Sequence, residues 1–510
     1  MSKTLTAAWG RSVGLGLRAA WGPKLAEVDF SALDPAAAQE RAFRRILAEC
    51  GAGEAGRAWG LHEARSFRDL RFLPTTDSKS LAPWVARVRE GGRAASGVFG
   101  RSLPLALGQT SGTTGEPKRF PITREFLASY RRSSERMNAA WVAHTGRWDH
   151  VALGLSLMLT ARPEAGRGPG GLPEGFMSGI MAEAVPLWIR HRTLPSRRLM
   201  REGEWDTKLD RVLDQARGRN VQLVAGVPPL FLAFAERALE RFGAASLREI
   251  WPELRTFYFG GMALSSRLEA TLRRVWGRDD LIFWEMYAAT EGQFGHRWRG
   301  DLPGMVFTSL ENVFLFSETP GGPLVALDEV RAGRRYGVVV TTPGGLVNYR
   351  MGDVVEILSE RPLTFRVCGR ENEEISLAGE KIATEQTEKA LEWAVGRVGQ
   401  RFSDYVLWAE EGRPHRLVWG LPSNGSDDTP AGPELAVALD EGLAAANPTY
   451  AEMRKQDFLF RAPRVVTLPP NLFTQYRDRN LDRGQFKGRR LFRDEVGFRT
   501  EYGVTSLSKD

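Results

Sequence analysis

The chain has 510 residues, more than one hydrophobic core usually organises, so we expect at least two domains. Hydrophobic residues make up 42% of the sequence and charged residues 26%, values that exclude disordered and collagen-like proteins. The formal net charge is +8, but arginine is dispersed along the whole chain without a long basic tract. A generally basic surface, or an anionic small-molecule substrate, is therefore favoured over a nucleic-acid-binding protein.

The sequence shows no clear membrane-spanning segment, signal peptide or cysteine-rich site. No apolar run approaches the roughly 20 residues of a membrane span, and the first residues lack the apolar core and cleavage site of a signal peptide. Cys50 and Cys368 lie far apart in sequence and indicate neither a disulfide framework nor a cysteine-rich metal site. Both are expected to be buried small hydrophobes. We expect a cytoplasmic protein without a membrane partner.

An amphipathic helix is predicted to open the protein. Asp34 is a favourable N-cap residue and Pro35 suits the first helical position. Apolar residues then recur at helical spacing from Phe43 to Cys50. Packed helices and turns from Phe67 to Trp84 are expected to lead to the next motif.

That motif is a polar loop between two apolar strands. Strands are predicted at Leu103 to Leu107 and at Arg119 to Ile122, and the connecting segment, Thr110 to Lys118, has the sequence TSGTTGEPK. Glycines let a ligand approach the backbone, and consecutive N–H groups, hydroxyls and a lysine can bind an anion. The candidate phosphate-binding residues are Ser111, Gly112, Thr113, Thr114, Gly115 and Lys118.

Two other interpretations of this loop can be compared with its sequence. The P-loop of nucleotide hydrolases is excluded, because the spacing G-x-x-x-x-G-K-[ST] and the passage from a strand straight into a helix are both absent. An ordinary surface loop rich in Gly, Ser and Thr remains the alternative.

An α/β core is predicted after the loop. Thr123 is a plausible N-cap for a long helix whose apolar face runs from Phe126 to Trp141, and Val151 to Leu159 is a candidate buried strand. The Gly- and Pro-rich passage from Pro163 to Gly175 is expected to be a loop. Apolar strands then alternate with helices, which predicts parallel pairing. The strands are Val221 to Val227, Thr256 to Phe259 and Leu281 to Trp284, and the helices are Leu230 to Phe242 and Ser266 to Trp276.

The remainder of the chain predicts a β-rich subdomain and a separate C-terminal domain. The subdomain begins after Val306, and its strands are Val313 to Phe316, Val338 to Thr342, Val354 to Leu358 and Phe365 to Cys368. Mixed helices and strands follow from Glu385 onward. The predicted domains are residues 1–370 and 371–510, with the boundary near Gly369 to Gly379.

Polar residues follow the predicted strands of the α/β core, at the edge where such sheets bind ligands. Gly260 and Gly261 follow one strand. The segment from Tyr287 to Gly292 follows the next, and offers Thr290 as a phosphate donor and Glu291 as an oxygen ligand suited to Mg²⁺. A helix N-cap is the alternative for Thr290 and Glu291.

Two more polar segments lie further along the chain. Asp353 ends the segment NYRMGD, and its carboxylate could accept both hydroxyls of a ribose, while a solvated acid in a turn is the alternative. Lys487 ends the segment GQFK within a basic run that includes Arg489 and Arg490. For that run a solvated basic face is the alternative.

The order of these motifs resembles that of the adenylate-forming ligase superfamily. Within it, the sequence is most similar to the auxin-conjugating acyl acid amido synthetases, the Gretchen Hagen three family. The segments that carry the narrower resemblance are Phe72-Leu73-Pro74, Leu81-Ala82-Pro83, Tyr349 to Asp353 and Gly484 to Lys487. The P-x-T-x-x-G-type lead-in of CoA ligases is absent, and Gly488-Arg489-Arg490 lacks the proline of the family's own K-x-P-R ending.

The resemblance implies a fold, a reaction and a set of residue roles. The implied fold is α/β, with a large N-terminal domain that contains α/β sheets and a β-rich subdomain, and a smaller mobile α+β C-terminal domain. The implied reaction is ATP-dependent activation of a carboxylic acid as an acyl-adenylate, followed by amide formation with an amine, often an amino acid. An AMP-forming acyl-CoA ligase, or a basic nucleic-acid-binding protein, is the alternative.

The implied roles centre on ATP and Mg²⁺. Ser111, Thr113, Thr114 and Lys118 would hold the β- and γ-phosphates with the help of Gly112 and Gly115, Glu291 would bind Mg²⁺, and Thr290 would contact the α-phosphate. Gly260, Gly261 and Tyr287 would flank adenine, Asp353 would bind ribose, and Lys487 would stabilise the charge that grows as pyrophosphate leaves.

The acid-binding pocket is harder to recognise in the sequence. Val227 to Phe231 and Phe176 to Ile180 would line an apolar cavity, and plain core is the alternative. His296 is expected to be structural rather than a catalytic base.

Overall fold

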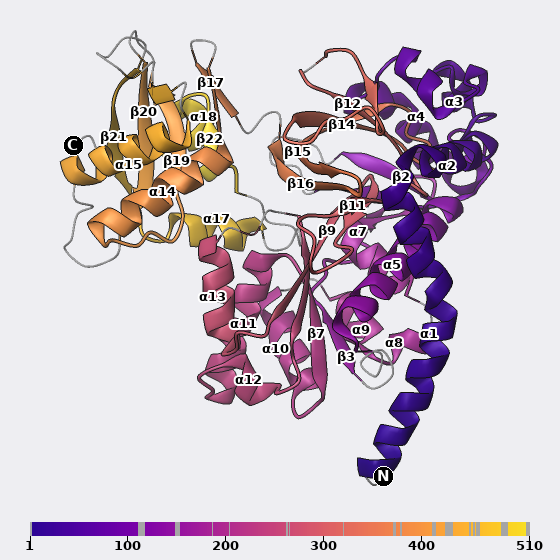
Figure 1. The fold of residues 1–510 in the computed structure, drawn as a ribbon, viewed down its shortest axis with the longest axis horizontal. Coiled ribbons are helices and arrows are strands. Elements are labelled where there is room, and N and C mark those ends of the chain that lie inside the picture. Colours follow the sequence, from indigo (N-terminus) through magenta and orange to yellow (C-terminus); the bar gives the residue numbers. More distant parts are fainter. Residues whose placement is uncertain are drawn as a thin grey trace.

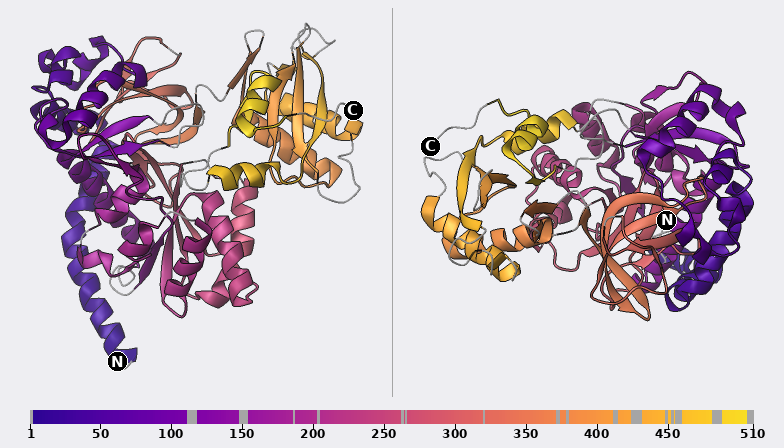
Figure 2. Two further views of the ribbon diagram at one scale, coloured as in Figure 1. Left: turned by 180° about the vertical axis from the view of Figure 1, so that it is seen from behind. Right: turned by 90° about the horizontal axis from the view of Figure 1, so that it is seen from above.

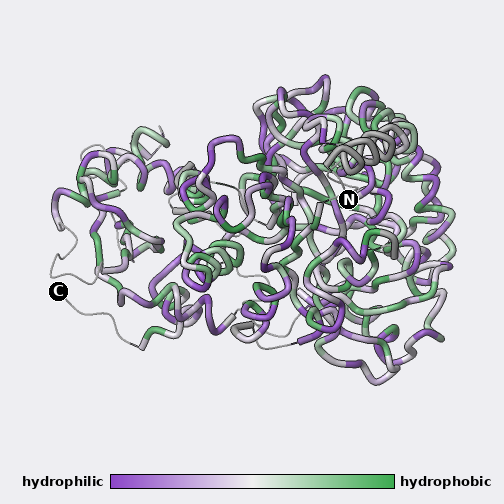
Figure 3. Tube along the Cα trace, turned by 90° about the horizontal axis from the view of Figure 1, so that it is seen from below, coloured by the Kyte–Doolittle hydropathy of each residue, from purple (hydrophilic) through white to green (hydrophobic). Residues whose placement is uncertain are grey.

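The computed structural model describes residues 3–110, 118–147, 154–185, 187–202, 205–261, 264, 266–319, 321–370, 374–377, 380–410, 415–423, 432–447, 450–451, 454, 460–480 and 488–505. Figure 1 shows two bodies of unequal size. The larger body carries the N-terminus and the smaller one the C-terminus. None of the helices in these residues combines the length and apolar composition that a membrane-spanning segment needs, and polar and apolar segments alternate along the trace (Figure 3).

The first element is a long helix that the sequence analysis missed. Helix α1 (Lys3–Leu33) precedes α2 (Pro35–Cys50), so the expectation that α2 opens the protein is wrong. The predicted cap of α2 is confirmed, because Asp34 Oδ1 accepts a hydrogen bond of 3.0 Å from Ala37 N–H. Val28 and Ala32 near the end of α1 are buried in the core. The N-terminal end of α1 projects from the larger body (Figures 1 and 2).

Short helices connect α2 to the first sheet, as expected for this segment. They are α3 (Glu54–Ala58), η1 (Leu61–Glu63), η2 (Phe67–Phe72), α4 (Ser78–Gly91) and η3 (Gly92–Ala95). The sheet has the order β2-β1-β5-β4, with β1 (Pro104–Gln109), β2 (Arg119–Thr123), β4 (Gly166–Arg167) and β5 (Pro173–Phe176). Strands β1 and β2 are antiparallel, which confirms the predicted pair around the polar loop.

The passage from Pro163 to Gly175 is not the simple loop that was expected. It contains β4 and most of β5, and β5 pairs in parallel with β1. Glycine and proline lower the local strand propensity, but pairing with a neighbouring strand overrides that preference.

The predicted parallel α/β core is confirmed as a seven-stranded sheet with the order β11-β10-β9-β8-β7-β3-β6. Strands β6, β3, β7, β8 and β9 run parallel, while β10 and β11 are antiparallel additions. The strands are β3 (Leu155–Met158), β6 (Thr193–Leu194), β7 (Val221–Gly226), β8 (Thr256–Gly260), β9 (Ile282–Ala289), β10 (Gly292–His296) and β11 (Val306–Phe307).

Helices cover both faces of this sheet. One face packs against α1 and α5 through Trp141, Tyr258 and Trp284. The other face packs against α10, α11 and α13, where the Phe231 ring contacts those of Phe257 and Trp276. The helices are α5 (Arg124–Thr145), α7 (Met177–Glu183), α8 (Leu187–Arg190), α9 (Arg197–Met200), α10 (Trp205–Ala216), α11 (Pro228–Phe242), α12 (Leu247–Ile250) and α13 (Ser266–Trp276).

The predicted β-rich subdomain is a five-stranded antiparallel sheet with the order β13-β12-β14-β15-β16. Its core is continuous with that of the N-terminal helices. The strands are β12 (Val313–Ser317), β13 (Val325–Ala326), β14 (Arg335–Thr341), β15 (Tyr349–Glu360) and β16 (Leu363–Arg370).

The smaller body has the expected α+β composition. Its sheet has the order β21-β20-β19-β22, with β19 (Val406–Glu410), β20 (His415–Pro422), β21 (Phe460–Leu468) and β22 (Leu491–Phe492). Helices α14 (Thr384–Val398) and α15 (Gly432–Ala446) pack on one face, and α17 (Leu472–Asn480) and α18 (Glu495–Tyr502) on the other. The hairpin of β17 (Glu374–Leu377) and β18 (Glu380–Ala383) precedes α14. The exact domain boundary at residues 370 and 371 stays a prediction.

Candidate active site

The segment from Tyr287 to Gly292 forms a tight hairpin at one edge of the seven-stranded sheet. Strand β9 continues through Tyr287 to Ala289, and Thr290 and Glu291 form the turn into β10. The N-cap alternative for these two residues is therefore wrong. The chain reverses here because β10 pairs antiparallel with β9, in the register Gly292↔Ala289.

The hairpin turn touches the strand that leads into the predicted phosphate loop. Thr290 Oγ1 lies 3.5 Å from Gln109 O. Close approach depends on Gly108, because a Cβ atom on that residue would lie 2.9 Å from Thr290 Cγ2. Two of the predicted motifs, which are far apart in sequence, thus meet at the end of β1.

The described part of the phosphate loop consists of its two ends. Thr110 N–H donates a 2.9 Å hydrogen bond to Lys118 O, and the Lys118 side chain is exposed. The other candidate residues of the loop lie outside the described residues, so their assignment stays a prediction; they are Ser111, Gly112, Thr113, Thr114 and Gly115.

Asp353 lies inside strand β15 rather than in a turn, so the alternative of a solvated acid is wrong. The side chain is buried. Tyr287 Oη donates a 2.6 Å hydrogen bond to Asp353 Oδ2, and Arg370 Nε donates one of 2.8 Å to Oδ1. Because β15 pairs on both sides, the motif continues the strand instead of preceding it.

Arg370 is a site residue that sequence reasoning missed. It is the last residue of β16 and faces Asp353 in the register of the two strands. The available signal was its position, because Arg370 is a cation two residues after a predicted strand and the last residue before the expected domain boundary.

Glu291 is buried beside these charged groups. Burial raises the pKa of its carboxyl group to about 7, and the negative charge of Asp353 adds to this effect, while Arg370 and Lys118 oppose it. Glu291 therefore interacts electrostatically with Asp353, Arg370 and Lys118. A bound cation would favour the ionised form of Glu291.

Gly260 and Gly261 lie at the end of the neighbouring strand. Gly260 ends β8 and pairs with Met286 of β9, and Gly261 has a φ of +84°. A Cβ atom on Gly260 would lie 2.5 Å from Met286 O. The two glycines therefore lie at the same sheet edge as Tyr287.

Asn348 is a second residue that the sequence analysis did not single out individually. It is fully buried and has a φ of +43°, which asparagine tolerates better than most residues. Its Nδ2 donates hydrogen bonds of 2.6 Å to Leu70 O and 3.3 Å to Leu73 O. Asn348 thereby joins the start of β15 to the Phe72-Leu73-Pro74 segment.

Lys487 lies outside the described residues, and its role stays a prediction. The nearby Arg490 is described, and for this residue the solvated alternative is wrong. Its Nε donates a 2.9 Å hydrogen bond to Asp404, its Nη1 pairs with Glu388, and its guanidinium lies 5.1 Å from the Tyr405 ring centroid. Arg490 is thereby fixed to the C-terminal sheet and α14.

The remaining candidate residues lie mostly in the hydrophobic core. Leu230 and Phe231 belong to the core of the seven-stranded sheet, and Met177 and Ile180 pack in a small cluster with Ala106.

His296 is buried, and its Nδ1 lies 2.9 Å from Arg297 O. Burial lowers its pKa to about 4, as expected for a structural residue. Cys50 is buried as expected, whereas Cys368 is only half-buried.

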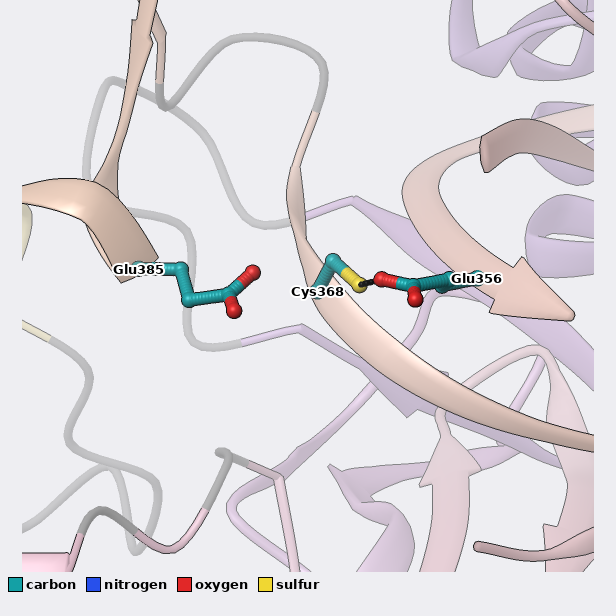
Figure 4. Close-up of side chains that lie close together, drawn as sticks. All are labelled: Glu356, Cys368 and Glu385. Atoms are coloured by element: carbon teal, nitrogen blue, oxygen red, sulfur yellow. Dashed lines mark hydrogen bonds between the residues drawn. The ribbon is translucent and has the colours of Figure 1, made fainter. Parts of the chain in front are cut away.

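Glu356, Cys368 and Glu385 form the group of three potential metal ligands found among the described residues (Figure 4). Both carboxylates already have cationic partners. Arg366 Nη2 lies 2.9 Å from Glu356, and Arg335 Nη2 lies 2.7 Å from Glu385. We call these five residues the junction cluster. It joins β14, β15 and β16 to α14, and its two carboxylates are neutralised without a metal ion.

Comparison with known proteins agrees with this arrangement of motifs. Sequence models of the GH3 family match the chain in three parts: the N-terminal domain at residues 24–209, the central domain at 310–370 and the C-terminal domain at 385–496. The chain belongs to the GH3 family. The resemblance to the Gretchen Hagen three family is thus confirmed.

Curated GH3 relatives are distant in sequence. The indole-3-acetic acid-amido synthetase GH3.3 of Arabidopsis thaliana is 25% identical over 216 residues, which cover 39% of this chain and 36% of the relative. The GH3 domain-containing protein of Homo sapiens is 28% identical over 262 residues, 46% of this chain and 47% of that protein. The alignments thus span between about a third and a half of these two proteins.

The fold is shared over almost the whole GH3 chain. The GH3.15 acyl acid amido synthetase in complex with 2,4-DB superposes with a TM-score of 0.75 at 17% identity, covering 95% of this chain and 96% of that one. A 2-hydroxyisobutyryl-CoA ligase superposes with a TM-score of 0.60 at 13% identity, covering 93% and 91%. The predicted fold class is therefore confirmed, with a large N-terminal part followed by a smaller C-terminal one.

Proposed function

We propose that this protein is an ATP-dependent ligase that activates a carboxylic acid as an acyl-adenylate and transfers the acyl group to an amine, often an amino acid. The observation that carries the proposal is that the hairpin turn after β9 contacts Asp353 through Tyr287 and the strand leading into the phosphate loop through Thr290, in a chain of the GH3 family. We also propose that residues 1–370 bind ATP and the acid, that residues 371–510 close over them, and that the protein acts in the cytoplasm.

The reaction needs positioning and charge stabilisation rather than a covalent nucleophile. In the first step a carboxylate oxygen of the acid attacks the α-phosphorus of ATP, and the bond from this phosphorus to the pyrophosphate oxygen breaks. In the second step the amine nitrogen attacks the acyl carbon and AMP leaves. One proton from the amine is released to solvent.

Each part of the nucleotide has a proposed partner. Asp353 would accept hydrogen bonds from the ribose hydroxyls, with its carboxylate oriented by Tyr287 and Arg370. Thr290 would donate to the α-phosphate from the hairpin turn. Residues proposed for adenine are Gly260, Gly261 and Tyr287, and those proposed for the β- and γ-phosphates are Ser111, Gly112, Thr113, Thr114, Gly115 and Lys118. Lys487 would stabilise the charge on the departing pyrophosphate.

The site is chemically suited to Mg²⁺, which we propose as the metal. Glu291 offers a hard oxygen ligand, and Mg²⁺ commonly binds through one or two carboxylates plus phosphate oxygens. Burial disfavours the ionised form of Glu291, and a divalent cation would compensate for this cost. When bound, Mg²⁺ would neutralise negative charge on the phosphates.

Acid-dependent release of pyrophosphate tests the adenylation step. We expect Lys118→Ala and Glu291→Ala each to lower kcat/KM for ATP by at least roughly 100-fold, because the first removes a cation that offsets the charge of the phosphates and the second removes the proposed ligand of Mg²⁺. Full activity in both variants would overturn the assignment. Lys487→Ala should impair adenylation and spare amide formation from a preformed acyl-adenylate.

An AMP-forming acyl-CoA ligase is the second candidate, because the fold is shared with the 2-hydroxyisobutyryl-CoA ligase. The two functions differ in the acceptor. Incubation with ATP, Mg²⁺ and a panel of carboxylic acids, in the presence of either amino acids or CoA, separates them. Amide formation without CoA supports the first proposal, and thioester formation the second.

A further inference from the structure

Glu174 is a buried carboxylate that none of the proposed steps uses. It lies in β5, and 4% of its surface is exposed. Its two oxygens accept hydrogen bonds from three side chains. Arg89 Nε donates to Oε1 at 2.5 Å, and Gln109 Nε2 and Arg119 Nε each donate to Oε2 at 3.0 Å.

Two of these donors flank the predicted phosphate loop. Gln109 is the last residue of β1, Arg119 is the first of β2, and the two are paired across the strands. The next pair outward, Thr110 and Lys118, is joined by the hydrogen bond from Thr110 N–H to Lys118 O. A single carboxylate oxygen of Glu174 therefore contacts both strands at the point where the loop leaves the sheet.

The other oxygen of Glu174 connects these strand ends to the rest of the larger body. Arg89 belongs to α4, which packs beside the first sheet, and β5 is itself hydrogen-bonded to β1. Glu174 thus joins α4, β1, β2 and β5 at one point. We call Glu174, Arg89, Gln109 and Arg119 the brace cluster.

The charges in the brace cluster favour a fixed geometry. Burial would raise the pKa of Glu174, but hydrogen bonds and charges from Arg89 and Arg119 outweigh it and hold the pKa below its usual range. The carboxylate is ionised at neutral pH. Hydrogen bonds between ionised partners are shorter and stronger than those between neutral groups.

We propose that Glu174 is a positioning residue for ATP: its carboxylate sets the separation of Gln109 and Arg119, and thereby the positions of the adjoining Thr110 and Lys118, the second of which is proposed to bind the β- and γ-phosphates. This inference rests on the proposed function. It predicts a defect confined to the step in which those phosphates are bound, because they have left before the amide forms.

Kinetics of the two half-reactions test the proposal in Glu174→Gln, which keeps the side-chain shape and removes the charge. We expect the KM for ATP to rise roughly tenfold, the kcat of adenylation to change less than about threefold, and amide formation from a preformed acyl-adenylate to stay unchanged. An unaltered KM for ATP, or an equal loss in both half-reactions, would overturn the proposal. Gln109→Leu removes only a neutral donor and should produce a smaller rise in KM, which gives a second test should the first variant fold poorly.

Glu311→Gln is the matched control. Glu311 is also buried, with 1% exposed, and accepts hydrogen bonds from Arg45, Arg132 and Arg136, so its hydrogen-bond partners among the described residues lie outside β1 and β2. Removing the charge of Glu311 should lower the thermal midpoint of unfolding as much as Glu174→Gln does. It should not raise the KM for ATP. A similar rise in KM in both variants would mean that general destabilisation causes the effect.

Hydrogen exchange of the Thr110 amide provides a readout that needs no catalysis. We expect this amide, which is bonded to Lys118 O, to exchange faster in Glu174→Gln than in the wild type and to be unchanged in Glu311→Gln. Equal protection of the Thr110 amide in the wild type and Glu174→Gln would overturn the proposal that Glu174 fixes the loop ends. If the wild type releases no pyrophosphate with any acid, the proposed function fails, whereas this measurement still decides whether Glu174 fixes the loop ends.

Discussion

Asp353 and Glu291 are two buried carboxylates in one site, and their partners differ. Asp353 accepts hydrogen bonds from Tyr287 and Arg370. Glu291 has a pKa that burial raises to about 7. Such a difference suits the roles that we propose, in which Asp353 binds the ribose hydroxyls and Glu291 binds a cation. Both acids could be identified as site candidates from the sequence. Their burial and the hydrogen bond from Arg370 to Asp353 could be seen only in the structure.

The hydrogen bond between Tyr287 and Asp353 should contribute measurably to stability. In Tyr287→Phe one buried oxygen of Asp353 loses its donor, and we expect the free energy of unfolding to fall by about 1–3 kcal/mol. Urea denaturation followed by tryptophan fluorescence measures this change. Tyr336→Phe is the control, because Tyr336 Oη accepts from a backbone N–H and bonds no carboxylate in this structure. A loss no greater than in the control would contradict the prediction.

His296 should make stability depend on pH in mildly acidic solution. Burial holds its pKa at about 4, against an ordinary value of 6.5, and the nearby charge of Arg136 adds to this effect. Between these two values the unfolded chain binds the additional proton, so stability falls as the pH is lowered from 6.5 towards 4. The contribution is roughly 3 kcal/mol at most.

The variant His296→Asn tests this expectation. The free energy of unfolding, measured at intervals between pH 7 and 5, should fall less steeply in the variant than in the wild type. The comparison cancels contributions from the other histidines. Parallel curves would mean that His296 takes up its proton as readily in the folded state as in the unfolded one.

At the scale of elements, a helix or strand could be predicted from the sequence where the spacing of its apolar residues matches the face that it buries. Helix α13 has the predicted bounds, Ser266–Trp276, because its apolar stripe faces the sheet and its ends are clear. Helix α1 was missed because its apolar residues do not form a continuous stripe along one face and because Pro23 lies inside it. Strand β5 was missed because its pairing with β1 lies outside any local pattern.

The link between β15 and the Phe72-Leu73-Pro74 segment depends on Asn348. Asn348→Gly keeps the φ of +43° accessible and removes all three side-chain hydrogen bonds, those to Leu70 O, Leu73 O and Thr341 Oγ1, so we expect a loss of about 1–3 kcal/mol in unfolding free energy. Asn348→Ala adds the backbone cost of a positive φ, roughly 1 kcal/mol more. Chemical denaturation of both variants measures the two effects separately. If Asn348→Ala lowers the free energy of unfolding no more than Asn348→Gly does, the backbone at this position relaxes to a negative φ.

At the scale of the whole molecule, the junction cluster joins the larger body to the smaller one. Arg335 and Arg366 on the β-rich sheet lie 2.7 and 3.5 Å from Glu385 at the start of α14. Their side chains are 41% and 46% exposed, so each pair contributes little by itself and is weakened by salt. The sequence predicted two domains, but no local pattern indicates which surface residues meet across them.

The double variant Arg335→Gln/Arg366→Gln should loosen the arrangement of the two bodies. We expect small-angle X-ray scattering to give a larger radius of gyration for the variant at low ionic strength. In about 1 M salt, where the Debye length is roughly 3 Å, wild type and variant should converge. Lys389→Gln is the control, because Lys389 pairs with Glu385 within α14 itself and does not cross the junction. Identical scattering at all salt concentrations would exclude a role for the cluster in domain arrangement.

The hydrogen bond from Tyr287 to Asp353 crosses from the seven-stranded sheet to the five-stranded one. The proposed nucleotide site is therefore built on a seam between two layers, which are also joined by backbone hydrogen bonds between Met305 and Phe365, and its width depends on how these layers are stacked. Apolar substitutions deep in the five-stranded layer, remote from any ligand, would then alter ATP affinity by shifting that layer. In a mutational scan for nucleotide binding, sensitive positions should follow the buried strands of both sheets as well as the polar motifs.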